Sequence, residues 1–412
     1  MAGKQLSQGL GASYSQDINN RHSYSCKAAV TTKQHIEKTR RPGSSRKTKI
    51  EPPTVRIEQA TASYEKWMRS CAPLVASDLR LKHEQMREDL FLFLRGTFYR
   101  WAQAWPEVGG DLAGAPKVLA VGDLHVNSFG TWRDAEGRLC WGVDDFDEAY
   151  SLAYTNDLVR LATSMKIVID AEGLAIKFKD GCDSIVEGYT QTLKDGGCPI
   201  VMEENEQKLG ELGVQNFKPP KDFWGKLNRL PAIRSSLNPE VERAFEKTLP
   251  EPGMEYKVVR RRAGLGSLGQ ERFVAIANWQ GGFIAREAKA LVPSSCTWVG
   301  GKTGRGQSYY QQAIGSAVRS RDPFQVTEGF WLIRRLSPDS NPIDIQDLPK
   351  HRDEEMLLHA MGREAANVHL GTRRQTANIL KDLRKKKASW LREGAVRMAR
   401  AVEKDWDCYR KS

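Results

Sequence analysis

The sequence lacks any apolar run that approaches the roughly 18–20 residues needed to cross a bilayer. It also has no apolar segment near its start of the kind found in secretory signal peptides. Its seven cysteines are scattered, odd in number and free of any C-x-x-C pair. A membrane-spanning protein, a disulfide framework and a cysteine-based zinc site are therefore not expected. We expect instead a protein of the cytoplasm, whose thiols stay reduced.

Acidic residues are scarce in the first fifty positions, which hold ten lysines and arginines against Asp17 and Glu37. This segment contributes +8 of the net charge of +12 and leaves +4 to the other 362 residues. Residues 1–57 are also rich in serine and poor in apolar clusters, so we predict a disordered basic tail. A transit peptide is the alternative. Nucleic-acid contacts are not expected beyond the electrostatics of this tail.

The remaining chain predicts an α+β fold in three parts. Residues 58–250 form a mainly helical lobe, because apolar residues recur at spacings of three and four over 58–105 and 158–171. Residues 251–345 form a β-rich lobe, with strand patterns at 258–259, 272–279, 283–288 and 330–335 and a helix near 308–318. Residues 346–412 are helical and are expected to pack on the helical lobe.

The chemistry is concentrated in residues 122–149. A short strand at 117–120 leads into Gly122-Asp123-Leu124-His125, and a hairpin with strands at 129–132 and 139–143 then leads into Asp144-Asp145-Phe146-Asp147. A lone Gly-Asp-x-His is a common turn, but one hairpin of this length would bring Asp123 and Asp145 to the same edge. Phosphoryl transfer needs such carboxylates, one to orient the attacking hydroxyl and others to bind magnesium.

This block resembles the catalytic region of aminoglycoside and choline phosphotransferases, in the kinase-like superfamily. The resemblance implies that Asp123 is the catalytic base and that Asp145, with Asp147, binds the metal. It also implies that Asp157 holds the backbone of the catalytic loop. The metal-binding asparagine of the pattern falls on Ser128, with Asn127 one position early. Either Asn127 reaches the metal through a local shift, or metal binding is weaker.

A glycine-rich loop follows about 120 residues later, with Gly264, Gly266 and Gly269 in a G-x-G-x-x-G pattern. A dinucleotide-binding fingerprint requires a helix directly after the glycines, whereas here a strand pattern follows. The loop is therefore predicted to cover nucleotide phosphates as in kinases, with an ordinary hairpin turn as the alternative. Arg286 falls in the slot of the phosphate-pairing lysine. Lys289 is the other candidate, on the opposite face of the strand.

The order of these motifs is the reverse of the kinase order, because the catalytic block precedes the glycine loop. Residues 361–369 resemble the helix that comes before the catalytic loop in aminoglycoside phosphotransferases, yet they lie near the end of the sequence. A circular permutation explains these placements together. We therefore expect a circularly permuted, two-lobed fold of the protein-kinase type.

Residues 86–345 as a whole resemble an uncharacterised bacterial family, domain of unknown function 2252. The matching stretches are 93–97, 122–130, 144–149, 157–162, 264–269 and 286–289. The resemblance assigns Arg95 and His125, beside Asp157, to the support of the site. The family name carries no activity.

Three functions remain open from the sequence. The first is an ATP-dependent phosphotransferase that uses Mg²⁺ and acts on a hydroxyl of a small molecule or a protein. The second is a nucleotide-binding pseudokinase with a regulatory role, suggested by Ser128 and Arg286. The third is a nucleic-acid binder acting through the basic tail. No short motif identifies the acceptor.

Overall fold

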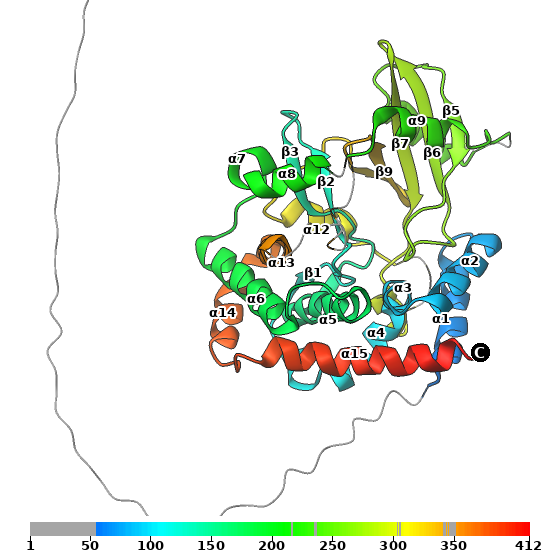
Figure 1. Cartoon of the computed structure of the whole chain (residues 1–412). Coiled ribbons are helices and arrows are strands. Elements are labelled where there is room, and N and C mark those ends of the chain that lie inside the picture. Colours follow the sequence, from blue (N-terminus) through cyan, green and yellow to red (C-terminus); the bar gives the residue numbers. More distant parts are fainter. Residues whose placement is uncertain are drawn as a thin grey trace, which may run out of the picture. The chain divides into compact units, whose positions relative to one another are not determined.

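The computed structural model describes residues 55–412, apart from residues 216, 235–236, 303, 305, 341–342, 344 and 346–351. Most of the predicted tail, residues 1–54, therefore lies outside the described residues. Residue 57, which was assigned to the tail, begins the first helix. The secondary structure is mixed, with helices and antiparallel strands in separate stretches of the chain, so the α+β class is confirmed (Figure 1).

Helices open the described chain, as predicted for residues 58–105. They are α1 (Ile57–Cys71), α2 (Ala76–Glu88), α3 (Leu90–Gly96) and α4 (Phe98–Val108), followed by the 3₁₀ helix η1 (Gly110–Gly114). Asp89 ends α2 in an extended conformation and caps α3, because its carboxylate accepts a hydrogen bond of 2.6 Å from the amide of Leu92.

Two short antiparallel pairs follow. Strand β1 (Lys117–Ala120) pairs with β4 (Tyr150–Ala153), and β2 (Phe129–Arg133) pairs with β3 (Leu139–Val143). The hairpin β2–β3 was predicted, but β4 was not: the chain was expected to turn helical directly after Asp147. The pairing of β4 with β1 joins residues some thirty positions apart, which a local pattern does not reveal.

The second half of the chain builds a five-stranded antiparallel sheet in the order β5-β6-β7-β9-β8 (Figure 1). Its strands are β5 (Lys257–Arg260), β6 (Arg272–Trp279), β7 (Gly282–Ala290), β8 (Val326–Glu328) and β9 (Trp331–Leu336). Helices α11 (Ser295–Val299) and α12 (Tyr310–Ser316) lie between β7 and β8 in sequence. The strands predicted at 258–259, 272–279, 283–288 and 330–335 are confirmed.

Each face of this sheet carries its own helix. Helix α10 (Pro239–Thr248) packs through Phe245 on the face that holds Ala288, and α9 (Pro220–Asn228) packs through Leu227 on the face that holds Ala285. Two further helices precede them, α7 (Met202–Asn205) and α8 (Gln207–Gln215). Because side chains alternate along β7, Arg286 shares the face of Ala288, whereas Glu287 and Lys289 share the face of Ala285.

The helical core forms around α5 (Tyr154–Glu172), which is buried over most of its length. It contacts α6 (Phe178–Asp195) and α15 (Trp390–Tyr409), while α6 packs closely on α13 (Arg352–His369). That last crossing needs glycine, since a Cβ at Gly188 or Gly362 would lie 2.2 Å from a carbonyl oxygen of the opposite helix. The 3₁₀ helix η3 (Leu370–Gln375) and α14 (Thr376–Leu383) join α13 to α15.

The predicted C-terminal helices are therefore present, and they pack on helices from the first half of the chain. None of the helices within the described ranges is long and apolar enough to cross a membrane.

Candidate functional site

A small cavity of about 50 Å³ lies where residues 122–149, the glycine loop (residues 264–269) and helices α1 to α4 meet. Seven residues singled out from the sequence line it, namely Arg95, Asp123, His125, Ser128, Asp145, Asp147 and Gly266. The other lining residues are Tyr64, Lys82, Gly96, Phe98, Tyr99, Glu148, Ser267 and Gln270. Segments more than 200 residues apart in sequence, from Tyr64 to Gln270, thus contribute to one site.

Hydrogen bonds to Asp157 fix the backbone of the loop that carries Asp123. The two carboxylate oxygens of Asp157 accept hydrogen bonds from the amides of Val121 (2.7 Å) and Gly122 (3.0 Å). Asp157 is completely buried, and Nε2 of His369 lies 3.0 Å from its Oδ2. Helix α13 thus supplies a partner to the residue that fixes the loop carrying Asp123.

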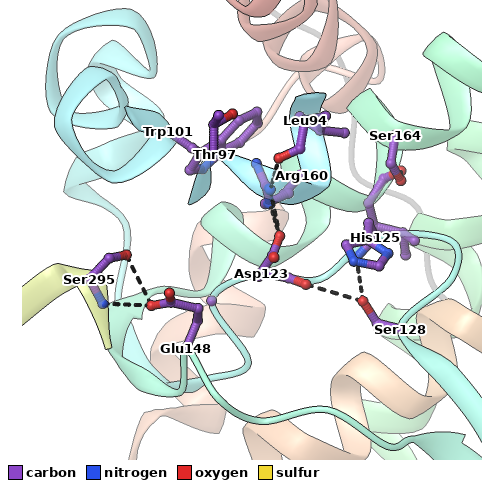
Figure 2. A network of polar contacts seen from close by, with 12 residues as sticks. Leu94, Thr97, Trp101, Asp123, His125, Ser128, Glu148, Arg160, Ser164 and Ser295 are labelled. Carbon is purple, nitrogen blue, oxygen red and sulfur yellow. Dashed lines mark hydrogen bonds and ion pairs between the residues drawn. The ribbon is translucent and has the colours of Figure 1, made fainter. Parts of the chain in front are cut away.

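Asp123 is paired with a buried arginine. Nε and Nη2 of Arg160 both lie 2.5 Å from Asp123 Oδ1, and Arg160 Nη2 also donates to the carbonyl oxygen of Leu94 at 2.8 Å (Figure 2). Burial raises the pKa of Asp123 above its usual value, although the charge of Arg160 opposes this shift. The arginine fixes the carboxylate in place and leaves Oδ2 as the oxygen that can accept a proton.

Ser128, not Asn127, faces the cavity. Its hydroxyl donates to the carbonyl oxygen of Asp123 (3.1 Å) and accepts from the amide of His125 (3.0 Å), so it closes the loop on itself (Figure 2). Asn127 does not line the cavity, and its buried Oδ1 has no hydrogen-bond partner among the described residues. Of the two alternatives from the sequence, a local shift that brings Asn127 to the metal or a weaker metal site, the placement of Ser128 at the cavity favours the second.

His125 contacts its own loop and helix α3. Its Nδ1 accepts a hydrogen bond of 3.2 Å from the amide of Asn127, and its ring meets Phe91 edge-on. Burial and the charge of Arg95 hold the pKa of His125 well below its usual value, so its imidazole is neutral. Arg95 also lines the cavity, with its guanidinium over the ring of Phe91.

Asp145 and Asp147 share one lysine. Lys289 Nζ lies 3.4 Å from Asp145 Oδ1 and also forms an ion pair with Asp147. Burial and the neighbouring charge of Asp145 raise the pKa of Asp147 to about 6, since two carboxylates compete for one cation. The side chain of Asp145 is 54% exposed, and Asp147 Oδ1 is buried without a hydrogen-bond partner among the described residues.

These two carboxylates suit magnesium only in the presence of further oxygen ligands. Within the described ranges, no group of three or more histidine, cysteine, aspartate or glutamate side chains is arranged to hold a metal ion. Magnesium is usually bound by one or two carboxylates, with water and substrate phosphates completing its shell. The unpartnered Oδ1 of Asp147 and the exposed Asp145 fit that mode of binding.

The glycine loop joins β5 to β6 and is fastened to α2. Gly264 and Gly269 have φ of +72° and +99°, which residues with a side chain rarely adopt. Lys82 donates to the carbonyl oxygen of Gly266 at 2.9 Å, and the amide of Val75 donates to that of Gly269 at 2.8 Å. Gly266 faces the cavity, whereas Gly264 and Gly269 shape the turn.

Arg286 lies outside this site, which corrects the expected placement. Its Nε donates to the carbonyl oxygen of Thr248 at 2.9 Å, and its guanidinium stacks 4.4 Å from the ring centroid of Phe324. The side chain of Lys289 lies on the opposite face of β7 and pairs with Asp145 and Asp147. Because side chains alternate along β7, Arg286 and Lys289 lie on opposite faces of the sheet. Helix α10 covers the face of Arg286, so this arginine is directed away from the cavity.

Three charged residues in or beside the site were not identified from the sequence: Lys82 and Glu148 line the cavity, and Arg160 pairs with Asp123. Lys82 and Arg160 lie on helices where a basic residue usually faces solvent, so no local pattern marked them. Burial lowers the pKa of Lys82 to about 8, although nearby carboxylates oppose the shift. Glu148 directly follows Asp147, and this position within residues 122–149 was the one feature of the sequence that could have marked Glu148 as a site residue.

Glu148 connects the catalytic block to α11. Its Oε2 accepts hydrogen bonds from the hydroxyl of Ser294 (2.8 Å) and from the amide of Ser295 (2.7 Å). Burial raises the pKa of Glu148 to about 7, although these hydrogen bonds oppose the shift.

The raised pKa of Glu148 predicts a pH-dependent stability. Between its unfolded pKa near 4.5 and its folded pKa near 7, the unfolded chain loses the proton while the folded chain keeps it. This group therefore lowers the free energy of unfolding as the pH rises through that window, by on the order of 1 kcal/mol per pH unit. Denaturation of wild type and Glu148→Gln between pH 5 and 8 should show a steeper loss in wild type. Parallel curves would contradict the assignment.

Comparison with known protein families matches about a third of the chain. Residues 74–216 match the family described as an uncharacterized protein conserved in bacteria (DUF2252). The match contains Asp123, Asp145 and Asp157, whereas the glycine loop and Lys289 lie beyond it. No curated protein and no solved structure matches the chain. Over residues 74–216, the chain is thus similar to this uncharacterised bacterial family.

Proposed function

We propose that the chain is a kinase-like, ATP-dependent phosphotransferase that acts on a hydroxyl of a small molecule or a protein. One observation carries the proposal: Gly266 of the glycine loop lines the same cavity as Asp123, Asp145 and Asp147, and Lys289 of β7 pairs with the last two of these aspartates. A glycine-rich loop, a lysine on the third strand and aspartates on the catalytic loop and after its hairpin are the parts of a kinase ATP site.

Each group has a role in this proposal. The backbone of Gly266 and Ser267 covers the nucleotide phosphates, and Lys289 pairs with them once ATP enters. Asp145 and Asp147 hold Mg²⁺, which would neutralise the charge that develops on the transferred phosphoryl group. Asp123 orients the attacking hydroxyl through Oδ2, while Arg160 fixes Oδ1.

The packing of α13 supports a circularly permuted kinase-like fold. In the resemblance to aminoglycoside phosphotransferases, this helix precedes the catalytic loop. Here it follows the loop in sequence by more than 200 residues, yet its last residue, His369, contacts Asp157 beneath that loop. The glycine loop, likewise late in the sequence, lies over the catalytic aspartates.

The site must widen before a nucleotide binds. A cavity of about 50 Å³ is far below the roughly 300–1,000 Å³ of typical ligand sites. The hydrogen bond between Lys82 and Gly266 draws the glycine loop down onto α2. Incoming phosphates would compete for the ammonium group of Lys82, and its release would let the loop lift.

A nucleotide-binding pseudokinase is the second candidate, and the geometry of Ser128 favours it. The hydroxyl of Ser128 is engaged within its own loop, and Asn127 points elsewhere. The site therefore offers fewer metal ligands than a kinase with an asparagine in this position. Tight nucleotide binding without turnover would establish this alternative.

The two cations of β7 provide a matched test of the nucleotide site. The Lys289→Met variant should bind ATP in the presence of magnesium roughly 10- to 100-fold more weakly than wild type, because charged hydrogen bonds to phosphate are lost. The Arg286→Met variant should bind ATP as wild type does, since Arg286 faces Thr248 and Phe324. Isothermal titration calorimetry measures both.

Circular dichroism would first show that both variants are folded. Equally weakened ATP binding in the two variants would mean that the loss reflects the net charge of the protein and not a contact of Lys289 with the phosphates. Unchanged affinity in Lys289→Met would remove the cavity from consideration as the nucleotide site.

A further inference from the structure

A second cavity, of about 160 Å³, lies on the other side of the segment 144–147 from the first. Asp145 lines the first cavity, whereas the preceding residue, Asp144, lines this one. Five cationic side chains surround it, those of Lys218, Arg261, Arg319, Arg334 and Arg335. We call it the arginine pocket. None of the functions considered above uses it.

Two of these arginines depend on a single carboxylate. Arg334 Nε lies 2.7 Å from Oε2 of the fully buried Glu287, and Arg261 pairs with the other oxygen of that glutamate. Nη1 of Arg272 also lies 3.1 Å from Oε2 of Glu287. One negative charge thus serves three guanidinium groups.

Two other arginines have no carboxylate partner among the ion pairs of the described residues. Arg319 donates to the carbonyl oxygen of Val143 at 2.8 Å and stacks on Trp132, and Arg335 stacks on Phe324. Nε of Arg319, and Nε and Nη2 of Arg335, are buried without hydrogen-bond partners in the part of the chain that the structure describes. Buried donors are nearly always satisfied in proteins, so these three atoms point to an absent acceptor.

The acidic residues of the pocket do not supply that acceptor. Asp144 and Asp322 are its two carboxylates, and neither forms an ion pair within 4 Å among the described residues. Among the described residues that line the pocket, four arginines therefore face two carboxylates, and Glu287 is already shared by three guanidinium groups.

We propose that the arginine pocket binds the phosphate group of a small anionic ligand. Planar guanidinium groups offer paired donors that match phosphate oxygens, and several of them around one anion favour its doubly charged form. The volume accommodates a phosphate with a few further atoms.

The pocket is connected to the glycine loop through Glu287. Arg272, which contacts Glu287, also donates to the hydroxyl of Ser267 at 2.7 Å. A phosphate that draws Arg261 or Arg334 away from Glu287 would strengthen the hold of Glu287 on Arg272. A phosphate in the pocket would thus alter the contact of Arg272 with Ser267, in the loop that lines the first cavity.

The test uses inorganic phosphate and pyrophosphate as probes, titrated calorimetrically into the full chain. Wild type should bind one phosphate per chain, and Arg335→Met and Arg319→Met should each weaken that binding at least tenfold. Arg286→Met is the matched control, because Arg286 stacks on the same ring of Phe324 yet does not line the pocket. It should bind phosphate as wild type does.

Three results would overturn the proposal. The first is that folded wild type takes up no phosphate, and the second is that Arg286→Met weakens binding as much as Arg335→Met does. The third is loss of phosphate binding in Lys289→Met but not in Arg335→Met or Arg319→Met, which would place the anion in the first cavity. Because the probes contain no nucleoside, failure here is distinct from failure of the nucleotide site.

Discussion

The Asp145→Asn variant is expected to lose magnesium-dependent ATP turnover by about a hundredfold or more. The amide keeps the shape of the side chain but removes the charge that would hold the metal, and interactions of this kind contribute several kcal/mol to the transition state. The side chain of Asp145 is 54% exposed, so the fold should tolerate the change. Release of ADP to solvent, measured without an acceptor, gives the rate.

Asp144→Asn is the matched control for this prediction. The two aspartates are adjacent, but Asp144 lines the arginine pocket and Asp145 lines the first cavity. Turnover should therefore persist in Asp144→Asn. An equal loss in both variants would show that the local charge matters and not the metal ligand. Absence of turnover in wild type, with ATP still bound, would favour the pseudokinase.

The Arg160→Met variant is expected to lower the free energy of unfolding by about 3–5 kcal/mol. Arg160 is completely buried, and its loss leaves the carboxylate of Asp123 without its partner and the carbonyl of Leu94 without its donor. The guanidinium also stacks 4.8 Å from the ring centroid of Trp101, a contact that methionine keeps in part. Urea denaturation followed by fluorescence measures the change.

A double variant separates the ion pair from the packing. Asp123→Asn combined with Arg160→Met removes both charges, so the double variant should be more stable than the sum of the single effects predicts, by roughly 1–3 kcal/mol. Additive effects would mean that the pair is not coupled. The cost of Arg160→Met would then come from lost packing.

Local patterns in the sequence were sufficient for the elements that depend on near neighbours. The hairpin between Asp123 and Asp145 followed from two short strands and a turn, and the glycine loop followed from a glycine pattern between strands. The alternation of β7 also separated Arg286 from Lys289. These features are encoded within a few residues, where periodicity and turn chemistry act directly.

Contacts between distant segments could not be obtained in this way. The choice between Arg286 and Lys289 depends on α10, which covers one face of the sheet. Arg160 and Lys82 acquire their roles from the fold, since their partners, Asp123 and Gly266, lie 37 and 184 residues away in sequence. Strand β4 was missed for the same reason. The hydrogen bonds of Ser128 likewise emerged only from the closed loop.

A crystal structure with manganese and a non-hydrolysable ATP analogue tests the central claim most directly. The account predicts an anomalous manganese peak beside Asp145 and Asp147, with the phosphates between the glycine loop and Lys289 and the loop lifted from Lys82. A nucleotide bound elsewhere, or a manganese ion away from both aspartates, would contradict it.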